Sequence, residues 1–303
     1  MAKKKSTKKA TTKKAAPKKA AAKKAAPKKA AAKPVDAAPD TTTVKKKIKV
    51  NMWRTRMHKE ELGIYQSLKY RAKTRLYSKD FDTEGLVEID GEKEWIIAYN
   101  KEKWENRTPD KARLLLRFFT ILEEKMGTGT GGNFIGGIEL SITHSLVQSF
   151  EINQAAPVMF VQRPRSPYLV RIVKGWRLKG NKWSWPLIPE KGADDKLQMV
   201  KAKGTVGLGR DYDIFLGDVK VARIDMQRME KDVEIEIYDE SCAKDKEFFV
   251  VLALFGASCF FQKEIEDIIE HHYKGMKDTG TADYKPPTYE LVLFRNPRFM
   301  TRR

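Results

Sequence analysis

One uncharged segment near the C-terminus constrains the fold more than any other part of the chain. Residues 248–261 read FFVVLALFGASCFF, and the nearest charges are Glu247 and Lys263. A helix that is apolar on every side must be enclosed on every side. At about 1.5 Å per residue this helix is about 21 Å long, short of the ~30 Å hydrocarbon core of a bilayer. The segment therefore favours a helix enclosed by protein over a transmembrane span.

Short β-strands are the dominant pattern in the hundred residues before this helix. Residues 232–238 alternate between an apolar face with Val233, Ile235 and Ile237 and a polar face. The other candidate strands are 138–143, 147–152, 157–162, 168–174, 197–202, 212–216 and 219–225. Many short strands with one buried face are typical of barrels and sandwiches. Because an open sheet would leave half of the apolar helix in water, we expect a mainly β (α+β) fold, a closed antiparallel β-barrel around a central apolar helix at residues 248–261.

Residues 51–130 predict a lead-in of helices and one hairpin, either preceding or belonging to a barrel domain of residues 131–303. Residues 59–76 have the spacing of a short helix, and Asp90-Gly91 predicts a tight turn between strands within residues 85–99. A second helix is predicted from Thr108, a capping residue, to Gly127, a typical stop. Its apolar face would consist of Leu115, Phe118, Phe119 and Leu122.

The first fifty residues form a separate, lysine-rich arm. They contain eighteen Lys, no Arg and two acids, Asp36 and Asp40, so they carry 18 − 2 = +16. Residues 51–303 hold 42 basic and 38 acidic residues, or +4. The arm repeats the pattern AAPKKAAAK and has no aromatic residue, so it cannot bury enough apolar surface to offset the entropy of ordering. We expect a disordered arm, with residues 35–44 as its linker.

A disordered polycation of this kind is expected to bind polyanions, most simply DNA or RNA, by releasing condensed counterions. The alternatives are anionic lipid, or a solubilising tail with no direct partner. The candidate nucleic-acid-binding residues are Lys3, Lys4, Lys5, Lys8, Lys9, Lys13, Lys14, Lys18, Lys19, Lys23, Lys24, Lys28, Lys29 and Lys33.

A second candidate polyanion site lies where basic and aromatic residues interleave, within residues 163–185. Its members are Arg171, Lys174, Trp176, Arg177, Lys179, Lys182 and Trp183. Such a mixture suits single-stranded nucleic acid or an anionic membrane surface. The alternative is that the aromatic rings face the core and the charges face water, as alternation along strands would produce.

The remaining motifs favour no catalytic, cofactor or metal site. Gly127-x-Gly129-x-x-Gly132 follows a predicted helix and precedes a strand, the reverse of a dinucleotide-binding context. His271 and His272 are adjacent on a helix and point about 100° apart. Cys242 precedes a helix, where a thiol pKa can be lowered, but it is more simply a surface residue. We therefore expect a protein that is not an enzyme.

The body resembles the tubby C-terminal-like superfamily, which includes LURP-one-related proteins and phospholipid scramblases. The likeness rests on residues 212–262, DYDIFLGDVKVARIDM through FFVVLALFGASCFFQ, and on the strand–turn–strand pattern of residues 150–173. It implies a barrel that contacts membranes or proteins and rarely does chemistry. Residues 51–130 and the predicted strand 288–294 depart from the pattern, and the acidic stretch before the helix is reduced to Asp239, Glu240 and Asp245. The arm is similar to the tails of linker-histone-like proteins.

Together these features predict a non-enzymatic, nucleic-acid-associated protein. The arm would supply sequence-independent binding and the barrel would be a docking module for a protein or anionic lipid, with no transmembrane span. The alternative is a membrane-surface scaffold that binds anionic lipid through the barrel. The corresponding location is cytoplasmic and nucleoid-associated in a bacterium, or nuclear in a eukaryote.

Overall fold

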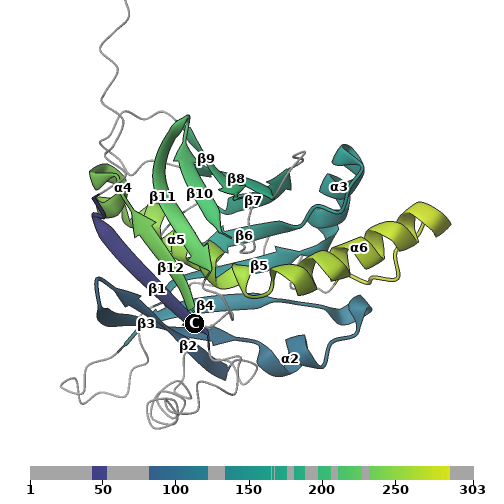
Figure 1. The fold of residues 1–303 in the computed structure, drawn as a ribbon. Helices are drawn as coiled ribbons and strands as arrows, with labels where there is room; N and C mark the ends of the chain where they lie inside the picture. Colours follow the sequence, from purple (N-terminus) through teal and green to yellow (C-terminus); the bar gives the residue numbers. More distant parts are fainter. Residues whose placement is uncertain are drawn as a thin grey trace, which may run out of the picture. The chain divides into compact units, whose positions relative to one another are not determined.

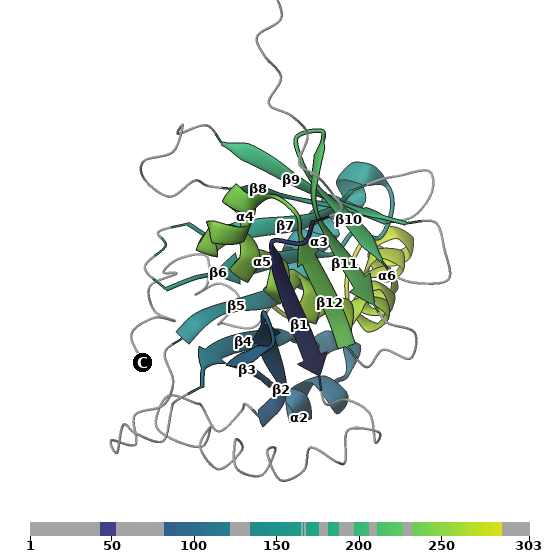
Figure 2. The same ribbon diagram turned by 60° about the vertical axis from the view of Figure 1, so that its left-hand side comes forward.

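Twelve strands form one closed antiparallel barrel (Figures 1 and 2). The computed structural model describes residues 43–52, 82–121, 134–164, 166, 168–175, 181–187, 197–205, 211–226 and 232–286. The strands are β1 (Lys46–Met52), β2 (Asp82–Ile89), β3 (Glu92–Tyr99), β4 (Leu115–Thr120), β5 (Phe134–Ser141), β6 (Val158–Gln162), β7 (Val170–Gly175), β8 (Lys182–Leu187), β9 (Gln198–Gly204), β10 (Tyr212–Leu216), β11 (Val219–Met226) and β12 (Asp232–Ile237). Each strand pairs with its neighbours in sequence, and β1 pairs with β12 to close the ring. The predicted fold class is confirmed.

The apolar segment forms α5 (Lys246–Cys259), which runs through the barrel. Phe249 stacks on Trp95 of β3, with ring centroids 6.1 Å apart. Phe255 meets Trp183 and Trp185 of β8 at 5.6 and 5.2 Å, and Tyr212 of β10 at 5.6 Å. Because strands on several sides of the ring contact α5, every residue from Glu247 to Cys259 is buried. The enclosure predicted from the uncharged segment is therefore what the structure shows.

The ends of α5 are defined by capping and by a sharp bend. Asp239 caps α4 (Glu240–Lys244) by accepting a hydrogen bond from Cys242 N at 2.8 Å. Asp245 caps α5 by accepting from Glu247 N at 2.7 Å. Two of the three acids before the helix thus have a structural role. After Cys259 the chain bends by 73° into α6 (Gln262–Thr279), whose C-cap is Gly280.

The predicted helix between Thr108 and Gly127 is wrong. The capping signal at Thr108-Pro109 produces only the short 3-10 helix η2 (Pro109–Lys111), and Leu115–Thr120 is strand β4. Leu116 and Phe118 face the interior, whereas Phe119 joins a second buried cluster with Leu86, Ile96 and Ala98. Since both faces of β4 are buried, its sequence lacks the alternation that identifies a strand.

The barrel starts at Lys46, inside the region assigned to the arm, so the predicted limit at residue 50 is corrected. Of the two alternatives for residues 51–130, the strands favour the one in which this region belongs to the barrel domain. The strands β1 to β4 come from the region assigned to the arm and the lead-in. Only the hairpin of that region was predicted: Asp90 and Gly91, with φ of 54° and 90°, turn β2 into β3. Residues 1–42, the predicted helix 59–76, the glycine motif at Gly127 and the predicted strand 288–294 lie outside the described residues.

Residues 147–152, predicted as a strand, belong to helix α3 (Ile142–Ile152), which also corrects the strand–turn–strand interpretation of residues 150–173. The buried residues Ile142, Ser145, Leu146 and Ser149 follow helical spacing. Ser145 and Ser149 accept hydrogen bonds from Val158 N and Ala156 N, at 2.8 and 2.9 Å. Short segments that fit both periods are ambiguous in sequence, and here the contacts with the start of β6 decide. The strand predicted at residues 232–238 is confirmed as β12. The strands predicted at 212–216 and 219–225 are confirmed as β10 and β11, which are joined by a turn at Gly217.

Gly256 provides a direct test of the enclosure of α5. A Cβ at this position would lie 3.0 Å from Ile235 Cδ1 and 3.4 Å from Val233 Cγ1 on β12. We expect Gly256→Leu to lower the free energy of unfolding by about 1–3 kcal/mol through overpacking, despite the better helix propensity of Leu. Chemical denaturation measures the change, with Gly275→Leu as a control because a Cβ there meets nothing within 4 Å. A Gly256→Leu protein as stable as the control would contradict close packing of α5 on β12.

Candidate functional site

The predicted basic-aromatic patch is only partly assembled on the surface. Trp183 is 2% exposed and faces α5, so its ring cannot stack on a base. Lys174 is buried and its Nζ lies 2.8 Å from the carboxylate of Glu266 on α6. Arg171 and Lys182 are partly exposed and belong to the outer side of the barrel. Trp176, Arg177 and Lys179 lie outside the described residues.

Strand register places two further lysines on the same outer face as Arg171 and Lys182. On β8 and β9, Lys182 is opposite Lys203 and Ser184 is opposite Lys201. On β7 and β8, Val173 is opposite Ser184, so Arg171 occupies the same outer face two residues along. We call Arg171, Lys182, Lys201 and Lys203 the β7–β9 basic face. The described residues of these three strands, VRIVKG, KWSWPL and QMVKAKG, include no acid.

Several lysines elsewhere on the barrel are paired with carboxylates. On β1, Lys47 lies 2.8 Å from Glu234 and Lys49 lies 3.2 Å from Asp232. On β11, Lys220 lies 2.6 Å from Asp213. Among the described residues, by contrast, no carboxylate lies within ion-pair distance of Lys182, Lys201 or Lys203. The β7–β9 basic face therefore has positive charge that the rest of the described barrel does not neutralise.

Lys201 and Lys203 were missed because neither stands beside an aromatic residue in sequence. The alternation Val200, Lys201, Ala202, Lys203 was visible, and it does predict two lysines on one face of a strand. The sequence did not show which strand pairs with β9. Its pairing with β8 brings Lys203 opposite Lys182.

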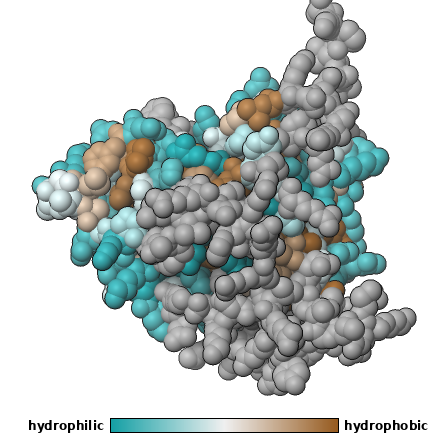
Figure 3. Space-filling view, turned by 180° about the vertical axis from the view of Figure 1, so that it is seen from behind, coloured by the Kyte–Doolittle hydropathy of each residue, from teal (hydrophilic) through white to brown (hydrophobic). Residues whose placement is uncertain are grey.

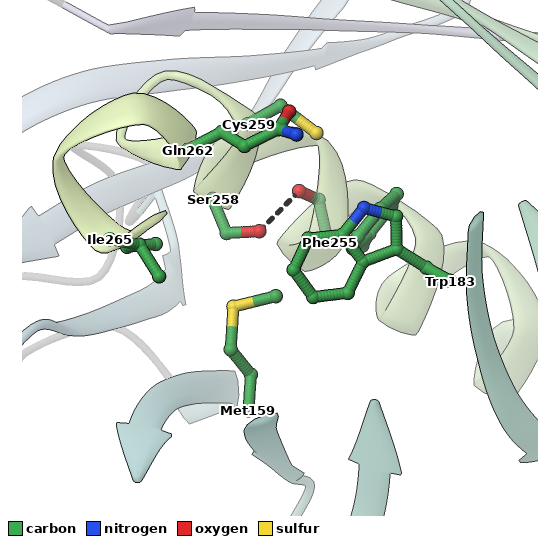
Figure 4. A pocket seen from close by; sticks show the side chains of 7 residues that line it. All are labelled: Met159, Trp183, Phe255, Ser258, Cys259, Gln262 and Ile265. Atoms are coloured by element: carbon green, nitrogen blue, oxygen red, sulfur yellow. Dashed lines mark hydrogen bonds between the residues drawn. The ribbon is translucent and has the colours of Figure 1, made fainter. Parts of the chain in front are cut away.

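The interior of the barrel offers no comparable site at the bend between α5 and α6. Figure 4 shows a pocket there between Met159, Trp183, Phe255, Ser258, Cys259, Gln262 and Ile265. Its volume is about 10 Å³, roughly the space of one water molecule. Ser258 Oγ donates to Phe255 O at 2.6 Å, and Tyr212 Oη donates to Gln262 Oε1 at 2.7 Å. These hydrogen bonds pair polar groups that line the pocket. The small volume of the pocket excludes a ligand larger than water.

Cys242 and His272 are both buried in the fold, whereas His271 is exposed. Cys242 is 2% exposed, so the predicted surface position is wrong. Burial raises the pKa of its thiol, which is the opposite of the lowering that a helix N-terminus can produce. His272 is buried and its Nε2 lies 2.9 Å from Pro109 O, which connects α6 to η2. In the described part of the chain, no three His, Cys, Asp or Glu side chains are grouped closely enough to hold a metal ion.

His272 makes the stability of the α6–η2 contact dependent on pH. The pKa of its imidazole is lowered, mainly by burial. The hydrogen bond to the Pro109 carbonyl raises this pKa, and the neighbouring His271 lowers it further. The unfolded state then binds a proton more strongly, so stability is complete above the unfolded pKa of about 6.5 and falls as the pH drops through that value. We expect His272→Gln to flatten the decline in unfolding free energy between about pH 7 and pH 5. His271→Gln removes only one of the lesser causes of the shift and should reduce the decline much less. Equal profiles for His272→Gln and the wild-type chain would contradict this assignment.

Exposed apolar residues are scattered over the described surface. Val147 and Phe150 are exposed on α3, and Leu197 and Met199 are exposed beside the basic face at the start of β9. Figure 3 shows one side of the molecule, where most of the coloured surface is hydrophilic and apolar residues form small separate groups. In the described chain no single helix is long and apolar enough to span a membrane, although α5 and α6 together reach that length and composition across their bend.

The fold and this face define a twelve-stranded antiparallel barrel filled by a helix, with an unneutralised basic strip on its outside. The chain matches no protein-family profile, no curated protein and no solved structure.

Proposed function

We propose that the protein is a non-enzymatic, nucleic-acid-associated protein whose arm binds DNA or RNA without regard to sequence. The observation that carries the proposal is the charge of residues 1–50, eighteen Lys against two acids. Lysines at this density neutralise phosphates and release counterions, which supplies most of the affinity in sequence-independent binding. The protein would act in the nucleoid of a bacterium or in the nucleus of a eukaryote.

The barrel would act as a docking module through its outer surface. Its interior is occupied by α5, and the pocket at the α5–α6 bend has space for about one water molecule. Both observations support a role for the outside of the barrel rather than for an internal ligand.

We also propose that the barrel is of the tubby C-terminal-like kind. A closed antiparallel barrel around a near-C-terminal apolar helix supports the likeness. Residues 51–130 departed from the superfamily's pattern in sequence, but they contribute strands β2 to β4 and the end of β1, so they fit a barrel better than their sequence indicated. Membership of this superfamily would favour the second candidate function, a membrane-surface scaffold for anionic lipid. Leu197 and Met199, exposed next to Lys201, are the apolar residues such a surface would use.

Co-sedimentation of the full chain separates the two candidates. Nucleic-acid association predicts binding to duplex DNA that weakens steeply between low and high salt, is equal for unrelated sequences, and exceeds binding to vesicles of phosphatidylserine and phosphatidylcholine. Vesicle binding without DNA binding at the same salt would replace the first candidate with the second.

A further inference from the structure

We infer that the β7–β9 basic face is a second nucleic-acid contact, which holds the phosphate backbone of a duplex independently of the arm. This inference rests on the proposed function, because it assigns the same class of ligand to a site on the barrel. The proposed function places affinity in the arm, whereas the inference adds a folded surface made of Arg171, Lys182, Lys201 and Lys203.

The first argument is the position of like charges in the sheet. Lys182 and Lys203 are directly opposite one another on β8 and β9, where equal charges repel. The acid next in register is Asp213 of β10, opposite Lys203, and its carboxylate is already bound by Lys220 at 2.6 Å. Because Asp213 is shared between Lys203 and Lys220, it offsets only part of the charge, and an anion placed over this face would reduce the remaining repulsion.

The second argument is spacing and shape. Lys201 and Lys203 are two residues apart on one strand, so they project from the same face about 7 Å from each other. Arg171 extends the face onto β7, and its Nη2 donates to Gln148 Oε1 of α3 at 3.1 Å, which holds the guanidinium in place. A row of positive groups on a rigid sheet suits an extended polyanion better than a single small anion.

The third argument selects duplex backbone over single-stranded nucleic acid. Recognition of single strands uses exposed rings on which bases stack. Trp183 and Trp185 of β8 face α5, and the ring of Phe215 is covered by Lys203, whose Nζ lies 3.9 Å from the ring centroid. The described residues of β7, β8 and β9 therefore include no exposed ring, and the exposed ring of Tyr168 lies before β7 rather than on it. These strands offer lysine and arginine charge, as a phosphate contact requires.

The test compares full-length variants in binding a short duplex DNA over a range of salt. Neutralising Lys201 and Lys203 together, as Lys201→Gln with Lys203→Gln, should make the slope of log affinity against log salt shallower by about two. The matched control is Lys244→Gln with Lys274→Gln, which removes the same charge from exposed lysines already paired with Glu240 and Glu270 at 2.9 and 2.6 Å. The conservative pair Lys201→Arg with Lys203→Arg should retain the wild-type slope.

The outcomes separate this inference from the proposed function. If wild-type protein does not bind duplex DNA, both the proposed function and the inference are overturned. If the wild type binds but the Gln face variant has the slope of the control, the inference alone is overturned. Loss of binding to phosphatidylserine vesicles with unchanged DNA binding also overturns it and assigns the face to lipid. Should the double variant unfold, each single Gln variant is expected to change the slope by about one.

Discussion

Deletion of residues 1–42 is expected to remove most of the affinity for duplex DNA. This segment contains fourteen Lys and two Asp, so it carries 14 − 2 = +12 of the net +20. Each phosphate neutralised contributes about −0.9 to the slope of log affinity against log salt, and six to ten such contacts change affinity by roughly 10³–10⁵ between 50 and 200 mM salt. The truncated protein should therefore bind far more weakly at low salt and show a much shallower slope.

The point of truncation follows from the structure. Removing residues 1–50 would also delete most of β1, whose pairing with β12 closes the barrel, and would confuse loss of binding with loss of fold. A chain beginning at residue 43 keeps that pairing. As a control, a full-length variant with the fourteen arm lysines changed to Gln keeps the length and loses the charge. Binding of the truncated chain with the wild-type affinity and slope would show that the arm is not the determinant.

An aspartate placed inside α5 is expected to abolish the folded state. Leu254 is 0% exposed, and an ionised carboxylate there would have neither water nor a cation as partner. Such burial costs several kcal/mol, comparable with the ~5–15 kcal/mol stability of a typical domain. We expect the same at the three other positions chosen to surround the helix, Phe249, Val251 and Phe260, which are all at most 9% exposed. Loss of the cooperative unfolding transition and of soluble yield are the measurements.

Lys246→Asp is the matched control for these variants. Lys246 is the first residue of α5 and is exposed, and an acid in the first turn of a helix is favourable. This variant should fold with nearly wild-type stability. If any of the four interior Asp variants unfolded cooperatively at a similar denaturant concentration, one side of α5 would be wet and the barrel would not enclose it.

Two errors in the sequence-based prediction have separate causes. β4 was taken for a helix because Leu115, Leu116, Phe118 and Phe119 are all apolar, and they are apolar because both faces of that strand are covered. β8 was missed although Trp183 and Trp185 alternate with partly exposed residues, since a mixture of Lys and Trp also describes a binding loop. Local patterns distinguish strand from helix only where one side of the element meets water.

The sequence by itself determined the features that depend on a single segment. The uncharged run in α5 requires enclosure whatever surrounds it, the Asp90-Gly91 turn joins two adjacent strands, and the net charge of the arm is a property of composition. Only the tertiary structure decided which residues meet. It turned the ring of Trp183 inward against Phe255, gave Lys174 a partner on α6, and placed Lys203 beside Lys182. These contacts depend on strand register and on closure of the barrel, and both are set by the packing of all twelve strands around one helix rather than by any local pattern.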